Sequence, residues 1–398
     1  MSWPKPDITC DIMFCDHICR GFLRCVASVT WCTWLKQLAL RCVLTVVTNL
    51  SRRSVLLGIG AVGAFLAIDL GAVAYANKWI GSTATLTRQT FMDGFRTVFG
   101  LHPGFRRNHA KGVVVNGYFD SNGSGRELSK AAVFTPGRTP VIGRFSLSGG
   151  NPKMADAPAV ARGFGLAFTF PDATQWRMAL LNLPVFVDHS PQGFYDRLLA
   201  SKRDPATGKA DPAAMSAFEK AHPESAAAMA VIKQHPPTTG FADSTYSSLI
   251  TFFFINDAGV RTPVRWAFVP MQAALPPLPG TTNSLFDALV RQMRGGSLRW
   301  RLLLTVGQPQ DPMSDATLPW PSDRRTVDAG VLTLTNIETE APGNARDVNF
   351  DPLVLPDGIE PSDDPLLSAR SAVYAASYRA RTGELKSPSA VQVDEVAP

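Results

Sequence analysis

Short runs of β-branched and aromatic residues dominate the hydrophobic pattern in the middle of the chain. Most are bounded by Gly, Pro, Asn or Asp, which commonly end strands, and Asp257-Ala258-Gly259 fits a hairpin loop between two of them. Many short strands separated by turn signals favour a closed or nearly closed antiparallel barrel. The expected strands are residues 111–120, 130–134, 141–146, 163–170, 178–181, 249–255, 264–268 and 298–306.

Helical periodicity flanks these strands, so the predicted fold class is α+β. An apolar face of phenylalanines predicts an amphipathic helix over 85–99. Near the other end of the chain, Asp363 or Asp364 can cap a helix whose first turn holds Pro365. The expected helices are 85–99, 213–233, 285–294 and 363–381, residues 307–365 show little periodicity apart from the strand-like 330–334, and 383–398 are expected to form a disordered tail.

Residues 54–76 form an apolar run that is long enough to span a bilayer. The run follows an arginine pair, Arg52-Arg53, and closes on Ala74-Tyr75-Ala76, which is the pattern of an export signal over 50–76. The arginine pair suggests the twin-arginine route. An uncleaved membrane anchor over 54–76 is the competing interpretation. Both place the rest of the chain outside the cytoplasm, in the periplasm or anchored and facing it.

All six cysteines lie in the first 42 residues. The rest of the chain therefore uses no disulfide, thiolate metal site or cysteine nucleophile. Because the spacings match no zinc pattern, residues 1–49 are interpreted as a Cys-rich, non-native extension from a misplaced start, with a cysteine-rich anchor as the alternative. The formal net charge of +6 comes without long basic runs, so nucleic-acid binding has little support.

The C-terminal helix carries candidate chemistry on one face. Arg370, Tyr374, Tyr378 and Arg381 recur at helical spacing. A cationic Arg one turn before a Tyr favours the phenolate, a hard anionic donor suited to ferric iron. Spacing alone favours a surface helix with an ordinary Arg–Tyr contact.

Three further polar residues stand in apolar surroundings. His109 precedes a predicted strand and can act as a general acid or base, although a lone His is often structural. Arg144 lies inside an apolar strand and needs an anion, which a carboxylate-bearing cofactor would supply. Asn182 interrupts another apolar run, where its amide needs a partner.

Together, in this order, these segments resemble the haem catalase family, and most of all its short, exported catalase-related peroxidases. The resemblance runs from about His102 to Arg381 and implies a catalase-like haem domain over 77–382, with a haem-ligand helix beside the barrel. The blocks that carry it are RNHAKG, VIGRFS, ARGFGLAF, LLNLPVF and RSAVYAASYRAR, extended by TLPWP, VDAGVLTL and FDPLVLPDGIEPSDDPLL.

The resemblance implies haem b as cofactor and a role for each matching residue. Tyr374 matches the axial iron ligand, His109 the distal histidine and Asn182 the distal asparagine. The other matching positions are Ser146 for the serine near the distal histidine, Phe194 for the aromatic over the haem face, Arg370 for the partner of the ligand, and Arg106, Arg144 and Arg381 for the arginines at the haem propionates.

The implied activity is reduction of organic hydroperoxides, and of hydrogen peroxide, with a small-molecule electron donor, as protection against oxidative stress. Catalases usually carry an apolar, channel-narrowing residue before the distal histidine, whereas this chain has Asn108. The family's NADPH-binding segments are absent from the sequence, which is consistent with a more open and shorter chain. The alternatives are a hydrogen peroxide dismutase and a non-catalytic haem binder or peroxide sensor. The sequence leaves the oligomeric state open.

Overall fold

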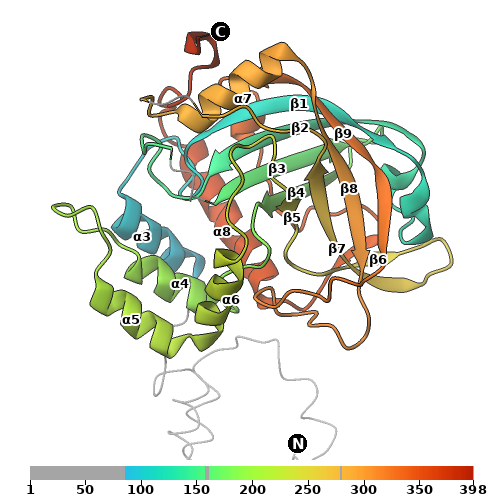
Figure 1. The fold of residues 1–398 in the computed structure, drawn as a ribbon, viewed down its shortest axis with the longest axis horizontal. Coiled ribbons are helices and arrows are strands. Elements are labelled where there is room, and N and C mark those ends of the chain that lie inside the picture. Colours follow the sequence, from blue (N-terminus) through green and yellow to red (C-terminus); the bar gives the residue numbers. More distant parts are fainter. Residues whose placement is uncertain (1–85, 157–160, 278–279, 398) are drawn as a thin grey trace, which may run out of the picture. The chain divides into compact units, whose positions relative to one another are not determined.

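The hydrophobic runs form a single antiparallel sheet that closes on itself in the computed structural model (Figure 1). The structure describes residues 86–156, 161–277 and 280–397. The strands are β1 (Gly112–Ser121), β2 (Gly137–Leu147), β3 (Arg162–Thr169), β4 (Gln175–Leu181), β5 (Tyr246–Ser247), β6 (Phe252–Ile255), β7 (Arg261–Pro270), β8 (Leu298–Val306), β9 (Thr326–Glu338) and β10 (Ile359–Pro361). Their order is β10-β6-β7-β5-β4-β3-β2-β1-β9-β8, and an additional pairing of β7 with β8 closes eight strands into a barrel, which confirms the predicted fold class.

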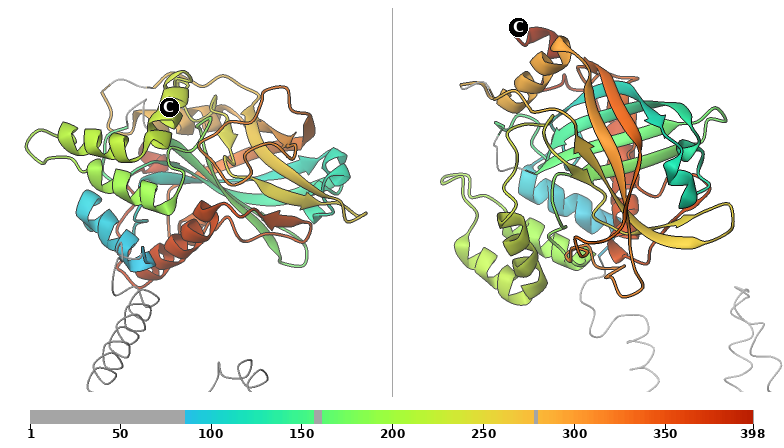
Figure 2. Two further views of the ribbon diagram at one scale, coloured as in Figure 1. Left: turned by 90° about the horizontal axis from the view of Figure 1, so that it is seen from below. Right: turned by 45° about the vertical axis from the view of Figure 1, so that its right-hand side comes forward.

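Helices gather along one side of the barrel and across its outer face (Figures 1 and 2). The helices are α3 (Arg88–Phe99), α4 (Pro191–Ala200), α5 (Pro212–Ala221), α6 (Pro223–Lys233), α7 (Ser284–Gly295) and α8 (Pro365–Thr382). Helix α8 begins where Asp364 accepts a hydrogen bond from the Leu366 amide, as the capping pattern predicts. Helices α3 and α4 pack against each other and against α8.

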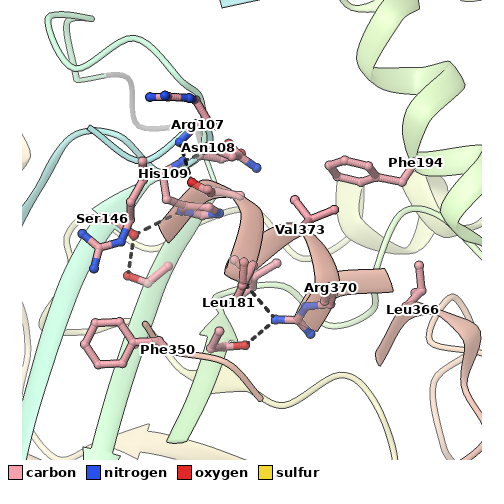
Figure 3. Close-up of a pocket in the computed structure, with 18 of the residues that line it drawn as sticks. Arg107, Asn108, His109, Ser146, Leu181, Phe194, Phe350, Leu366, Arg370 and Val373 are labelled. Atoms are coloured by element: carbon pink, nitrogen blue, oxygen red, sulfur yellow. Dashed lines mark hydrogen bonds between the residues drawn. The ribbon is translucent and has the colours of Figure 1, made fainter. Parts of the chain in front are cut away.

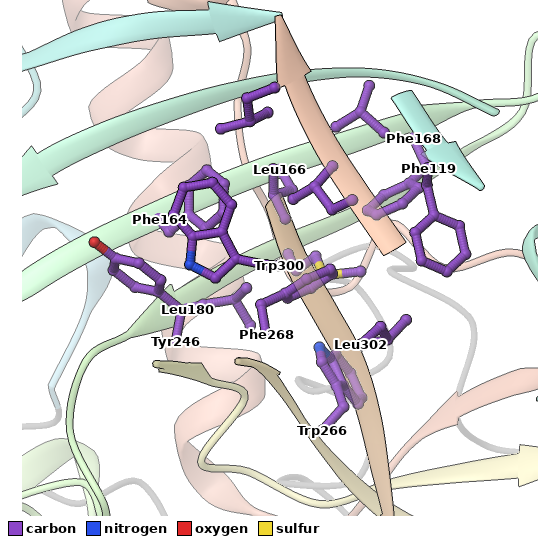
Figure 4. Packing of buried hydrophobic residues seen from close by; sticks show 14 of the residues in the cluster. Phe119, Phe164, Leu166, Phe168, Leu180, Tyr246, Trp266, Phe268, Trp300 and Leu302 are labelled. Atoms are coloured by element: carbon purple, nitrogen blue, oxygen red, sulfur yellow. The ribbon is translucent and has the colours of Figure 1, made fainter. Parts of the chain in front are cut away.

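Alternation along the strands separates the barrel core from the outer surface. On β2, Phe145 points inward, where its ring stacks on that of Phe164 with centroids 4.2 Å apart. Its neighbours Arg144 and Ser146 point to the opposite face, because successive strand residues face opposite sides. Aromatic and aliphatic side chains fill the interior (Figure 4), so the barrel is a packed core and its outer wall is free to form a site.

Two local predictions are wrong. Residues 130–134 are not a strand: Ala132–Phe134 form a 3-10 helix beside a strand end. The helix predicted over 213–233 is two helices, because Pro223 lacks the amide hydrogen that would continue the first. Helix α4 and strand β10 were not predicted, and the 330–334 run is the centre of the longer strand β9.

The C-terminal tail is ordered, not disordered as predicted. Val391, Val393 and Val396 are buried within the main hydrophobic cluster. The Val393 amide donates to Thr339 Oγ1 at 2.8 Å, and Arg294 donates to the Val393 carbonyl at 2.7 Å. Burial of these three valines therefore orders a segment whose polar, proline-containing composition predicted disorder. The predicted extension and export signal lie outside the described residues, and none of the described helices is long and apolar enough to cross a membrane.

Candidate functional site

A cavity lies between the outer face of β2–β4 and helix α8, with α3 and α4 beside it (Figure 3). Eight of the nine residues predicted for the site line it: Arg106, His109, Arg144, Ser146, Phe194, Arg370, Tyr374 and Arg381. These residues come from a loop, one strand and two helices that are far apart in the sequence. The fold therefore assembles in one place most of what the sequence motifs only suggested.

His109 is fixed by the strand beside it. Its Nδ1 lies 3.1 Å from Ser146 Oγ, and the Ser146 hydroxyl donates to the Gly163 carbonyl. With the hydroxyl proton used there, Nδ1 donates to Ser146 and Nε2 keeps its lone pair. Gly163 is required for this approach, because a Cβ at that position would lie 2.8 Å from His109 Nδ1.

The electrostatic surroundings keep the His109 imidazole neutral. Burial, reinforced by the guanidinium groups of Arg144, Arg370 and Arg106, lowers the pKa of His109 to about 3. Both causes act against the charged form. At neutral pH the ring is therefore a proton acceptor at Nε2.

Tyr374 and Arg370 occupy the α8 side of the cavity. Arg370 Nη2 lies 3.4 Å from the Tyr374 hydroxyl and donates to the Ala179 carbonyl of β4 at 3.0 Å. The bond to β4 holds the guanidinium beside the phenol, and the two residues lie one turn apart on α8, as the four-residue spacing predicts. Figure 3 shows Arg370 and Val373 projecting from α8 toward the same cavity as His109 and Ser146.

Three arginines gather at one end of the cavity, the half-buried Arg106 and the buried Arg144 and Arg381. Arg106 and Arg144 share the buried carboxylate of Glu340, at 3.2 and 2.7 Å. The nearest carboxylate oxygen to Arg381 belongs to Asp347, at 4.0 Å.

The three guanidinium groups outnumber the carboxylates beside them, so this end of the cavity carries an excess of positive charge. Burial and the neighbouring arginines lower the pKa of Arg106 well below its ordinary value and that of Arg381 to about 10. The charge of Arg144, with its hydrogen bonds, holds the pKa of Glu340 below its usual range although burial opposes this. Because buried cations need counter-ions, this end of the cavity suits a ligand with carboxylates.

Phenylalanines form the α3–α4 side of the cavity. Phe194 of α4 lies near-parallel to Phe186, with ring centroids 6.4 Å apart, and edge-on to Phe95 at 6.2 Å. Phe91 packs against Phe194 from α3. This side offers an apolar surface for a flat cofactor or for the alkyl part of a substrate.

Asn182 lies beside the cavity and is not among its lining residues, although Leu181 and Leu183 are. Its Oδ1 accepts a hydrogen bond from the Arg162 amide at 2.6 Å, next to the Gly163 that contacts His109. Since Oδ1 is engaged with the main chain, the amide nitrogen is the atom left to donate.

Sequence reasoning missed two residues at the site. Phe350 packs on the wall at Gly165, where a Cβ would meet its ring at 2.8 Å, and Arg106 lies over its face. Glu340 comes from the stretch that shows little periodicity, so no local pattern marked it. A carboxylate so close to an apolar strand was the available signal.

Comparisons with known proteins agree with this geometry. A family model described as catalase matches residues 104–276. A catalase-related peroxidase of Synechococcus elongatus is 40% identical over 311 residues, covering 76% of this chain and 91% of the relative. One of Mycolicibacterium paratuberculosis is 31% identical and is covered to 96% of its length.

Solved catalases share the fold. A bacterial catalase superimposes with a TM-score of 0.62 at 23% identity, over 71% of this chain and 58% of that one. Catalase A of Saccharomyces cerevisiae gives a TM-score of 0.63 at 22% identity, over 71% of this chain and 62% of that one. The chain thus spans less than two thirds of these larger proteins but nearly all of the shorter relatives. By sequence and by fold, the chain belongs to the haem catalase family.

Proposed function

We propose that the chain is a haem-dependent peroxidase that reduces organic hydroperoxides, and hydrogen peroxide, with an external small-molecule electron donor. One observation carries the proposal: a neutral His109 and an arginine-flanked Tyr374 line the same cavity, which has a phenylalanine-rich side. A non-catalytic haem binder would need no such proton acceptor. The resemblance of the chain to catalase-related peroxidases supports the same activity.

The residues present fit haem b. The cluster of Arg106, Arg144 and Arg381 provides the positive charge that two propionates would neutralise. Tyr374 would hold the iron, with Arg370 at its hydroxyl, and Phe194 would pack on the macrocycle. When bound, the haem would supply a redox-active iron and the electrons needed to cleave the O–O bond of the peroxide.

His109 would transfer the proton of the hydroperoxide, and Asn182 would hold the peroxide in position. Nε2 of the neutral imidazole accepts the proton of the hydroperoxide and returns it to the departing oxygen, so the organic product leaves as an alcohol. Ser146 keeps the ring in the required tautomer through Nδ1. The Asn182 amide would orient the peroxide by donating a hydrogen bond.

The low pKa of His109 predicts an unusual pH profile. The imidazole stays neutral down to about pH 4, so kcat/KM for a hydroperoxide is expected to stay level from pH 8 to about 5. A fall centred near pH 6.5, the ordinary histidine value, would contradict this assignment. The unfolded chain takes up this proton at higher pH, so acid also destabilises the fold, and rates must be read where near-UV circular dichroism is native.

Substrate preference separates the peroxidase from a dismutase. The test compares donor oxidation driven by tert-butyl hydroperoxide with oxygen release from hydrogen peroxide, both per haem. We expect donor oxidation to dominate, because the apolar α3–α4 side accepts an alkyl group. Dominant oxygen release would instead identify a hydrogen peroxide dismutase.

We further propose export to the periplasm, with the 50–76 segment as a cleaved signal or as an anchor over 54–76. The support is the order of arginine pair, apolar run and Ala-Tyr-Ala end. Fractionation of cells expressing the full chain tests this. Recovery of the protein in the cytoplasm alone would rule it out.

A further inference from the structure

The main chain of His109 is held in a conformation that only surrounding contacts can maintain. Its φ is +55°, in the left-handed region that residues with a Cβ seldom occupy. Such a conformation costs free energy and persists where neighbouring groups fix it. Asn108 fixes it directly and Glu340 fixes it through Arg144. Neither the family motifs nor the proposed chemistry assigns a role to Asn108 or Glu340.

Asn108 fixes the N-terminal side of this turn. Its Oδ1 accepts hydrogen bonds from the His109 amide at 3.0 Å and from the Gly149 amide at 2.9 Å. The Gly149 carbonyl in turn accepts from the Ala110 amide at 2.9 Å. The Asn108 amide thus joins the histidine loop to the segment after β2.

Glu340 fixes the C-terminal side through Arg144. Arg144 donates to the His109 carbonyl at 2.9 Å and to the Ala110 carbonyl at 3.1 Å. The same guanidinium is held by both Glu340 oxygens, Nε to Oε1 at 2.7 Å and Nη2 to Oε2 at 3.0 Å. Arg144 thus uses most of its N–H donors to bind the histidine loop and Glu340. This is in addition to the contact with a haem propionate that the resemblance implies.

We infer that Asn108 and Glu340 are positioning residues for His109, which hold its main chain from opposite sides and so aim Nε2 into the cavity. Glu340 Oε1 also accepts from Arg106 at 3.2 Å, so the carboxylate joins the histidine loop to the arginine cluster. The inference rests on the proposed function for the use made of His109. The hydrogen bonds by which Asn108 and Arg144 hold the His109 main chain are called the clamp below. The clamp can be measured without any peroxide chemistry.

Hydrogen–deuterium exchange in the full chain tests the clamp directly. In Asn108→Val and Glu340→Gln, amides 109 and 110 are expected to exchange on the order of 10-fold faster, with or without added haem. Asn108→Asp keeps an oxygen acceptor and is expected to retain the protection. Glu360→Gln, which removes an exposed ion pair with Arg261, serves as the matched control. Wild-type exchange in both Asn108→Val and Glu340→Gln would overturn the inference.

Kinetic measurements then show whether the clamp also positions the His109 imidazole for catalysis. Misplacing the imidazole is expected to lower kcat/KM about 10- to 100-fold for hydrogen peroxide and tert-butyl hydroperoxide alike in Asn108→Val, with Asn108→Asp near wild type. If valine merely narrowed the channel, only the bulkier substrate would slow, and the positioning role would be refuted. If the two variants exchange faster but the wild type reduces no peroxide, the clamp stands and the proposed function is refuted.

Discussion

Tyr374→Phe is expected to lose haem, or to keep it without the charge-transfer absorption of a phenolate on iron. Phenylalanine preserves the ring that lines the cavity and removes only the oxygen beside Arg370. Because removing even a supporting partner of a metal ligand weakens metal binding about 10- to 100-fold, loss of the ligand itself should cost at least as much. Haem content per chain after purification, together with the visible spectrum, measures the effect.

Tyr378→Phe is the matched control. Tyr378 lies one turn further along α8 and packs on the Arg381 guanidinium, 4.8 Å from the ring centroid, outside the residues that line the cavity. Its substitution should leave haem content and spectrum unchanged. Full haem occupancy and a wild-type spectrum in Tyr374→Phe would refute Tyr374 as the ligand.

His109→Ala is expected to bind haem normally and to cleave peroxide about 100- to 10,000-fold more slowly. The range is the usual contribution of a positioned proton acceptor. Haem binding should survive, because the arginine cluster and Tyr374 do not depend on the imidazole ring. The measurement is the stopped-flow absorbance change of the haem on mixing with tert-butyl hydroperoxide.

His235→Ala provides the comparison, since His235 is exposed and its ring nitrogen Nδ1 lies 2.9 Å from the Val231 carbonyl of α6, outside the cavity lining. It should react like wild type. An unimpaired rate in His109→Ala would show that proton transfer in this cavity does not use His109, and the mechanism would need another acceptor.

Most barrel strands were predictable because they are short runs of β-branched and aromatic residues bounded by turn residues. β2 alternates inward apolar residues with Arg144 and Ser146, and this pattern needs no knowledge of the partner strands. Closure of the barrel was only a general expectation, because β5 contains two residues and its role depends on pairing with both β4 and β7. The ordered tail was missed because its burial depends on contacts with α7 and residue 339.

The residues of the site were likewise predictable only in part. Arg370 and Tyr374 are one turn apart, so local spacing suggested their contact, and His109 stood out beside a strand. Only resemblance to the family joined them. Glu340 had only one weak signal, a carboxylate close to an apolar run, because its bond to Arg144 connects residues 196 positions apart and its segment shows little periodicity. Likewise, no sequence rule predicts the left-handed turn at His109 that makes Asn108 important.

The proposed function depends above all on haem bound in the cavity through the Tyr374 phenolate. Resonance Raman spectroscopy of the haem-loaded full chain, excited in its charge-transfer band, detects this bond. We expect one haem per chain, with enhanced phenolate vibrations that disappear in Tyr374→Phe. A haem that shows an iron–histidine signature, or a chain that takes up no haem, would contradict it.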